Sequence, residues 1–376
     1  MKKQLTVALG LAVLATPAFA SKARLMALGE DANGSFFIND NRNIFLNAAE
    51  ANNHADMVTF EWGEANQSDD DTAPNAEGGI LYSHKNLVYG LHLGRTMNFQ
   101  DVAANDGDMY SPSNTIDLFV AGDAGFKWGA NFTYSQSNDD THVVAGTPGK
   151  AEGQAMDLNV GAIFGNASVY VKGGLMGKAE QREAGSKVKF DRDQEFEVGG
   201  SYRLNKYTLL TQVGMEEYSI KGRANKQTQE NTFYTMGAAR TERLSDKTMM
   251  FVKLSAFMSE EEFKDGAKTT VDTVAVPVAI GFEHDATSWL TLRGSVAQNL
   301  WSNEEVKVSQ QKKQERTLAN STSVNAGATL KLGDFMVDGL IGTGNNGAGQ
   351  ISDLDNERGV LSLDNLMTRV SLTYRF

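Results

Sequence analysis

The sequence predicts a transmembrane antiparallel β-barrel of about sixteen strands, with fourteen or eighteen as alternatives. Three features favour this fold: an amphipathic strand that ends the chain, a long series of similar segments before it, and gaps that are alternately long and short. Strands of such a barrel turn apolar side chains to lipid and polar ones to the lumen. Their connections are short at one end of the barrel and long at the other.

The terminal segment, residues 365–376, alternates strictly. Leu372, Tyr374 and Phe376 share one parity with other apolar residues, and mostly polar residues share the other. A β-strand sends alternate side chains to opposite faces, so this strand has one apolar face. The segment resembles the C-terminal signature that the barrel-assembly machinery of bacterial outer membranes recognises, so Tyr374 and Phe376 are the predicted assembly signal. An amphipathic edge strand of a soluble protein is the alternative.

Similar alternation begins at Met57, and residues 57–376 are therefore the predicted barrel domain. The segment 126–136 is the clearest, with Phe126, Trp128 and Phe132 on one parity and Lys127 on the other. The predicted strands are 57–63, 78–83, 87–95, 115–121, 126–136, 155–164, 167–176, 193–204, 207–219, 231–243, 248–258, 272–284, 288–299, 321–332, 335–343 and 365–376.

The connections favour one closed barrel over a soluble sandwich. Short gaps contain Gly165-Asn166, Asn205-Lys206 and Gly333-Asp334, which are typical of tight hairpins. Long gaps contain charged runs such as residues 68–71 and 310–316. This asymmetry predicts short periplasmic turns and long extracellular loops.

The start of the chain has the pattern of a secretory signal peptide. Lys2 and Lys3 precede an apolar run, and Ala18-Phe19-Ala20 forms a cleavage site, so cleavage is expected after Ala20. Residues 21–56 follow as a periplasmic or lumen segment. Within it, 35–38 and 43–46 could pair as a short hairpin, and 47–54 could form a short helix.

The composition narrows the classes of function. The chain has 35 basic and 47 acidic residues, a net charge of −12, and removing the two signal-peptide lysines leaves 33 against 47, or −14. This acidity argues against a nucleic-acid partner. There is no cysteine, and no two of the five histidines have metal-ligand spacing, so neither a metal nor a cofactor is expected. Nothing places a nucleophile beside a base, so an enzyme is not expected.

A family resemblance supports the barrel. The segments Ser21-Lys22-Ala23-Arg24-Leu25, Asn41-Arg42-Asn43-Ile44-Phe45-Leu46 and Thr59-Phe60-Glu61-Trp62-Gly63 resemble the major outer-membrane porin-like proteins of Bdellovibrio-type bacteria. The similarity is specific over about the first sixty residues and architectural beyond them. It implies a channel of the bacterial outer membrane, without naming a solute.

The polar faces of the predicted strands carry equal numbers of basic and acidic side chains. Burying each of these charged side chains unpaired in a dry interior would cost several kcal/mol, whereas a water-filled pore accommodates them. Pairing as ordinary salt bridges is the alternative. The predicted lumen residues are Lys127, Lys172, Arg203, Lys253, Arg293, Lys331, Arg369 and Arg375, and Glu61, Asp117, Asp157, Glu195, Glu197, Glu216, Glu283 and Asp338.

These features predict a porin for passive diffusion of small hydrophilic solutes and ions. A substrate-selective channel is the alternative within transport, and a receptor, adhesin or structural barrel with a closed lumen is a different class. The expected partners are outer-membrane lipid, lipopolysaccharide, the assembly machinery and, by analogy with sixteen-stranded porins, two further copies in a trimer. The third long gap, residues 137–154, is predicted to fold inward, with Asp139 and Asp140 setting cation preference.

Overall fold

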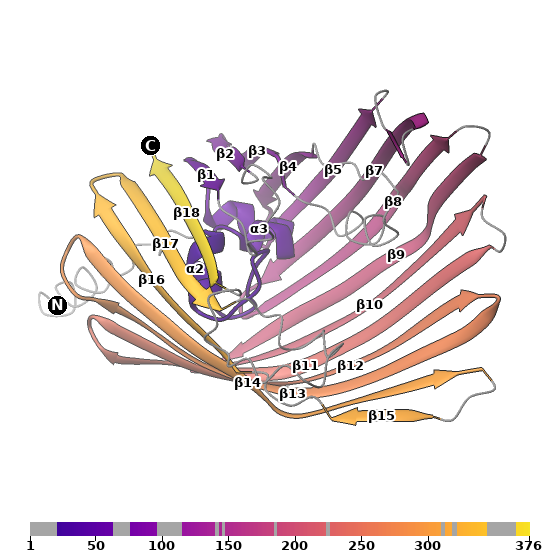
Figure 1. Cartoon of the computed structure of the whole chain (residues 1–376). Coiled ribbons are helices and arrows are strands. Elements are labelled where there is room, and N and C mark those ends of the chain that lie inside the picture. The colour runs from indigo at the N-terminus through magenta and orange to yellow at the C-terminus, as the bar shows by residue number, and fades with distance from the viewer. Residues whose placement is uncertain are drawn as a thin grey trace, which may run out of the picture.

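A closed antiparallel β-barrel surrounds the folded N-terminal segment in the computed structural model (Figure 1). The structure describes residues 21–62, 76–95, 115–139, 143–144, 147–183, 186–222, 226–309, 313–317, 322–343 and 366–376. The barrel closes because β1 (Met57–Trp62) pairs with β18 (Leu366–Arg375) on one side and with β2 (Glu77–His84) on the other. The predicted fold class is therefore confirmed.

Each predicted strand is present, and the described residues form a wall of sixteen strands. Two short strands add to this wall. β6 (Val143–Val144) pairs with β7, and β15 (Gln314–Thr317) pairs with β14. The remaining wall strands are β3 (Leu87–Leu93), β4 (Thr115–Asp123), β5 (Lys127–Asp139), β7 (Thr147–Phe164), β8 (Ala167–Glu183), β9 (Ser186–Leu204), β10 (Tyr207–Lys221), β11 (Gln227–Ser245), β12 (Thr248–Asp265), β13 (Ala267–Asp285), β14 (Leu290–Val308), β16 (Ser323–Leu332) and β17 (Phe335–Thr343).

The short-turn end of the barrel, here called the turn end, is built as predicted. Gly165, Asn205 and Gly333 have φ angles of 57°, 55° and 65°, the left-handed conformation that tight hairpin turns require. Aromatic rings also gather at this end. Phe335 and Tyr374 have ring centroids 4.5 Å apart, and Phe376 stacks on Tyr82 at 6.5 Å.

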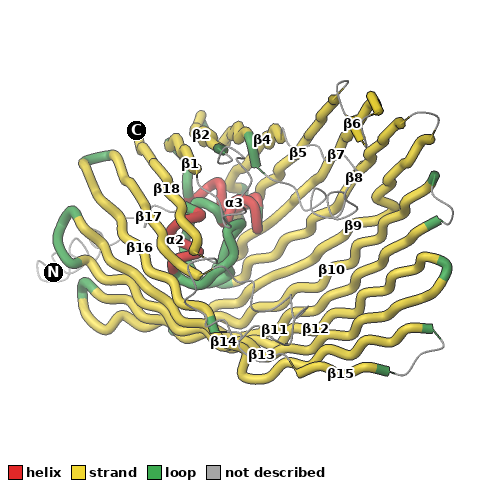
Figure 2. Tube along the Cα trace, viewed as in Figure 1, coloured by secondary structure: helices red, strands yellow, loops and turns green. Residues whose placement is uncertain are grey.

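The opposite, loop end of the barrel differs from the prediction. Much of the predicted loops 177–192 and 259–271 is strand, and β11, β13 and β14 each reach 19 residues, against 6 for β1. Figure 2 shows these long strands rising on one side of the barrel. About 9–11 residues suffice to cross a bilayer. The outward faces of these extensions carry charged residues such as Lys187, Lys189, Lys264 and Lys268, which is why an alternation with apolar outward residues did not identify them.

An outward belt of apolar side chains runs along most wall strands. Trp289, which directly precedes β14, and Trp301 on β14 are both about half exposed and bound this belt. Twelve residues span about 40 Å along a strand, or roughly 28 Å across a bilayer at a tilt of about 45°. Other exposed members include Phe60, Ile80, Leu91, Leu118, Val160, Val171, Tyr202, Leu209, Met236, Leu254, Ile280, Leu330 and Ile341.

Residues 21–56, here called the lumenal segment, contain α2 (Lys22–Ala27), α3 (Asn43–Leu46) and the 3₁₀ helix η1 (Ala48–Asn53). Figure 1 shows α2 and α3 inside the ring of strands. No helix in the described part of the chain is long and apolar enough to span a bilayer.

The predicted helix at 47–54 is confirmed by η1, but the predicted hairpin of 35–38 with 43–46 is wrong. The side chain of Asn43 accepts a hydrogen bond from the Ser35 N–H at 2.8 Å and donates one to the Ile38 carbonyl at 2.8 Å. One side chain thereby satisfies backbone groups that strand pairing would have used.

Candidate functional site in the barrel lumen

The first anchor of the lumenal segment is a buried ion-pair network around Arg24. Its guanidinium donates to both carboxylate oxygens of Glu283 on β13, at 2.9 and 3.1 Å, and to Asp40 at 3.1 Å. Arg24 and Asp40 are 2% and 0% exposed. Removing one partner of such a buried pair costs about 3–5 kcal/mol, because the other charge is left uncompensated. The network therefore fixes α2 against the wall.

A second anchor joins the lumenal segment to β1 and β2. Arg42 is buried and contacts Glu77 and, at 3.5 Å, Glu61. The ammonium of Lys22 lies 2.8 Å from Glu77, and the Lys22 N–H donates to Glu61 at 3.0 Å. Two cations thus share two carboxylates, and their charges balance.

The third anchor places η1 against β5 and β7. Gly129 and Gly161, which pair across these strands, leave the room that η1 occupies, because an added Cβ would collide with Ala48 and Asn47. The amide of Asn159 donates to the Phe45 carbonyl at 3.1 Å. These inward glycines are a local feature of sequence that places the helix.

Apolar contacts pack the lumenal segment against β11, β12 and β13. Phe37 and Ile38 pack against Ala239, Phe251 and Ala279 of β11, β12 and β13. The rings of Phe37 and Phe251 meet edge to face at 5.1 Å. The lumenal segment is therefore held from several sides of the barrel.

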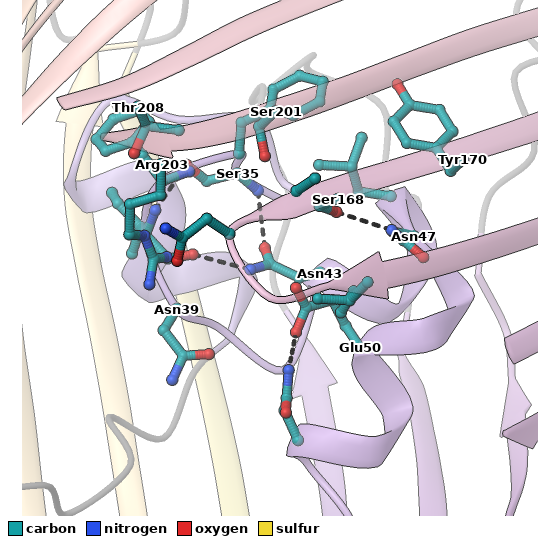
Figure 3. Close-up of a pocket in the computed structure, with 18 of the residues that line it drawn as sticks. Ser35, Asn39, Asn43, Asn47, Glu50, Ser168, Tyr170, Ser201, Arg203 and Thr208 are labelled. Carbon is teal, nitrogen blue, oxygen red and sulfur yellow. Dashed lines mark hydrogen bonds between the residues drawn. The ribbon is translucent and has the colours of Figure 1, made fainter. Parts of the chain in front are cut away.

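Between this segment and β7–β10 lies a polar cavity of about 330 Å³, here called the throat (Figure 3). Hydrogen bonds order its wall: Asn47 donates to Ser168 at 2.9 Å, and Asn53 donates to Glu50. The labelled lining residues are Ser35, Asn39, Asn43, Asn47, Glu50, Ser168, Tyr170, Ser201, Arg203 and Thr208.

A larger cavity of about 1680 Å³, the turn-end chamber, adjoins the throat. It reaches the turns at 205–206, 246–247, 287–288 and 333–334 and the terminal Phe376. The two cavities share Phe37, Ile38, Asn39, Arg203 and Thr208. Arg203 therefore lies where the two cavities adjoin.

The structure separates the predicted lumen residues into three groups. Lys127, Lys253 and Glu283 hold the lumenal segment, through Asn53, Glu30 and Arg24 respectively. Arg203 lines both cavities. Glu61 also contacts the lumenal segment, through Lys22 and Arg42. Several others form ion pairs that do not involve this segment: Lys172 with Glu197 at 3.0 Å, Glu195 with Arg192, Asp117 with Arg95 at 2.8 Å, and Arg293 with Asp338 at 2.9 Å. Arg369 is partly buried in β18.

The sequence analysis did not identify Arg24, Arg42 or Arg192 as site residues. The first two precede the regular alternation, and Arg192 lies in a predicted loop. The one sequence signal was the unusual density of Asn and Asp in residues 21–56, which cap, turn and hydrogen-bond to the wall.

The predicted constriction at 137–154 also differs from the structure. Residues 137–139 and 147–154 extend β5 and β7, and Ser137 pairs with Gly153 and Asp139 with Ala151. Asp140 lies outside the described residues. These flanks belong to the wall because their backbone groups pair with each other, and in the described residues it is the lumenal segment that narrows the barrel.

No protein family matches the sequence, and a search of curated proteins gives no match. Similar solved structures include the TodX deltaS2S3 mutant monoaromatic hydrocarbon channel, with 10% identity over 95% of this chain and 99% of that chain and a TM-score of 0.41. The Pseudomonas putida toluene transporter TodX has 10% identity over 92% and 95% and a TM-score of 0.37. OmpT, an outer membrane protein of Vibrio cholerae, has 13% identity over 85% and 97% and a TM-score of 0.31. At these TM-scores the likeness identifies no function for this chain.

Proposed function

We propose that this protein is an outer-membrane channel for the passive diffusion of small hydrophilic solutes, and that its lumenal segment sets the narrowest section. The observation that carries the proposal is the polar throat, which opens into the turn-end chamber. A sixteen-stranded barrel encloses more space than its own side chains fill. Here a folded segment occupies part of that space and leaves a polar cavity beside β7–β10.

The throat chemistry favours hydrophilic solutes. Its Asn, Ser and Thr side chains offer donors and acceptors that replace the water molecules a polar solute loses in a narrow section. An apolar solute would displace those waters and leave the polar groups unsatisfied, at a cost of about 1–3 kcal/mol per group. The passage therefore favours small polar molecules.

The outward apolar belt, the aromatic rings at the turn end and the predicted signal peptide support an outer-membrane location. Cleavage after Ala20, recognition of Tyr374 and Phe376 by the assembly machinery, contact with lipopolysaccharide, and a trimer remain parts of the proposal. A relationship of the first sixty residues to the porin-like proteins of Bdellovibrio-type bacteria is likewise part of the proposal.

Single-channel recording in planar bilayers tests the proposal. The parent protein should give ohmic conductance steps. Ser201→Trp fills the throat from β9 and should lower conductance several-fold, whereas Leu209→Trp, on the lipid face of β10, is the matched control and should leave it unchanged. Deleting residues 21–54 should raise conductance.

Two outcomes would contradict the proposal. A silent parent protein would indicate a barrel with a closed lumen, such as a receptor or adhesin. Conductance that is the same in Ser201→Trp and in the parent would place the passage away from the throat.

A further inference from the structure

The turn-end chamber has a charge opposite to that of the whole protein. Eight Lys or Arg and four Asp or Glu side chains line it, a local balance of +4, whereas the chain carries −12. In the throat, Lys127 and Arg203 outnumber the single acid Glu50. Positive charge is therefore concentrated along the inner passage.

Part of this charge is neutralised by pairing. Arg24 and Arg293 both bind Glu283, Arg293 also binds Asp338, and Lys331 lies 2.7 Å from Asp285. These ion pairs attach the lumenal segment or join neighbouring strands. They leave little charge for a passing solute.

Three other cations, Arg203, Arg243 and Lys247, have no carboxylate at ion-pair distance among the described residues. They come from the turn ends of β9 and β11 and from the turn that follows β11, and all three are exposed to the lumen or its mouth. Asp246 and Asp334, which have no cation at ion-pair distance among the described residues, lie on turns at the rim, and Lys247 shares the turn of Asp246. Inside that rim, the exposed side chains of Arg203 and Arg243 make the chamber cationic.

We propose that the turn-end chamber attracts small anions, carboxylates or phosphates, and makes the channel anion-preferring. The inference rests on the channel function proposed above and names its solute class. A cleft with low-dielectric walls focuses the field of the charges that line it and raises the local concentration of the opposite ion. Guanidinium groups also match carboxylate and phosphate oxygens with paired N–H donors.

Arg203 is the central residue of the proposed anion path, because it lines both the throat and the chamber. Each solute that crosses this junction meets its guanidinium. Arg243 and Lys247 lie farther towards the mouth and supply charge that an anion reaches before or after the junction. The three together form a short series of weak sites, which lets an anion enter and also leave.

Reversal potentials across a potassium chloride gradient test the inference. The parent should prefer chloride, more strongly at 0.1 M salt, where the screening length is about 10 Å, than at 1 M, where it is about 3 Å. The triple variant Arg203→Gln, Arg243→Gln and Lys247→Gln should lower the chloride-to-potassium permeability ratio by at least about threefold.

A matched control removes the same charge from the outer wall. Lys264→Gln, Lys268→Gln and Lys307→Gln lie on the outward face of β12–β14, with side chains about half exposed, and should leave the permeability ratio unchanged. Heat-modifiable mobility on gels checks that both triple variants form barrels. A cation-preferring parent, or equal ratios in the parent and the chamber variant, would overturn the inference.

Binding of inorganic phosphate keeps the two proposals distinguishable. If the parent does not conduct, the channel proposal fails, but detergent-solubilised protein should still broaden the ³¹P signal of phosphate more than the chamber variant does. Equal broadening by both proteins would overturn the anion site as well. Broadening by the parent that is lost only in the chamber variant supports the site with or without conduction.

Discussion

At the scale of single residues, Asp40 and His54 have opposite responses to burial in the lumenal segment. Burial raises the pKa of Asp40 from its ordinary 3.8 to about 7, and Arg24 offsets only part of this effect. Burial lowers the pKa of His54 from 6.5 to about 3, and the charges of Arg375, Arg24 and Lys127 act in the same direction. Each pKa unit corresponds to about 1.4 kcal/mol.

These shifts predict opposed pH dependences for docking of the segment. Asp40 binds its proton more tightly when docked, so its contribution is full below about pH 4 and is lost as pH rises through 7. His54 loses its proton on docking, so its contribution is full above pH 6.5 and is lost as pH falls towards 3. Between about pH 4 and 6.5 the two slopes largely cancel, and the parent should show a nearly flat profile.

Single variants should reveal the pH dependence that each of the two groups contributes to docking. His54→Gln should dock more firmly at pH 5 than at pH 7, and Asp40→Asn should dock less firmly at pH 5 than at pH 7, by about 1–2 kcal/mol in each case. Hydrogen exchange of the η1 amides, corrected for intrinsic exchange rates, measures docking. Identical profiles for the two variants would show that neither group titrates in this way.

At the scale of one strand, β13 contains both lipid-facing and water-facing positions. Ile280 and Thr270 point outward from the same face, but Ile280 lies in the apolar belt, whereas Thr270 pairs with Glu262 and Lys307 beyond it. Ion pairs around Thr270, such as Lys268 with Glu262, are exposed and contribute about 0–1 kcal/mol each. The loop-end part of β13 is therefore predicted to stand in water.

Lysine substitutions at Ile280 and Thr270 test which part of β13 contacts lipid. Ile280→Lys should lower the free energy of unfolding in lipid vesicles by about 2–4 kcal/mol, because a charge is placed in hydrocarbon. Thr270→Lys is the control on the same face and should change it by less than about 0.5 kcal/mol. Urea titration followed by tryptophan fluorescence gives both values. An equal loss at Thr270 would show that lipid covers the loop end.

At the scale of the whole molecule, the two ends of the barrel predict its orientation. The turn end gathers both the end of the lumenal segment and the C-terminus, since the Phe376 N–H donates to the Asp56 carbonyl at 3.1 Å. The chain contains no cysteine, so single introduced thiols report their own accessibility. In intact cells, a polymer-linked maleimide should label Asp265→Cys at the loop end and should label Lys206→Cys at the turn end only after lysis. Labelling of Lys206→Cys in intact cells would invert the orientation.

Local patterns were enough to predict the wall. Strand alternation and hairpin chemistry depend on neighbouring residues, so the sixteen strands and the turns at 165–166, 205–206 and 333–334 were predicted to within a few residues at the turn end. Arg203 was predicted as a lumen residue from parity alone. Boundaries at the loop end were predicted poorly, because charged residues on both faces of β12 and on the outward face of β13 remove the alternation on which the prediction rests.

The interior depended on contacts between distant parts of the chain. Arg24 and Glu283 are 259 residues apart, and no local pattern pairs them. Residues 43–46 read as a strand by composition, yet they form a helix because Asn43 and the surrounding wall satisfy their polar groups. The throat exists only where the lumenal segment, held by buried ion pairs, leaves space beside β7–β10. Its shape follows from packing around a closed ring, since each buried charge must meet a partner that the closed barrel brings to it.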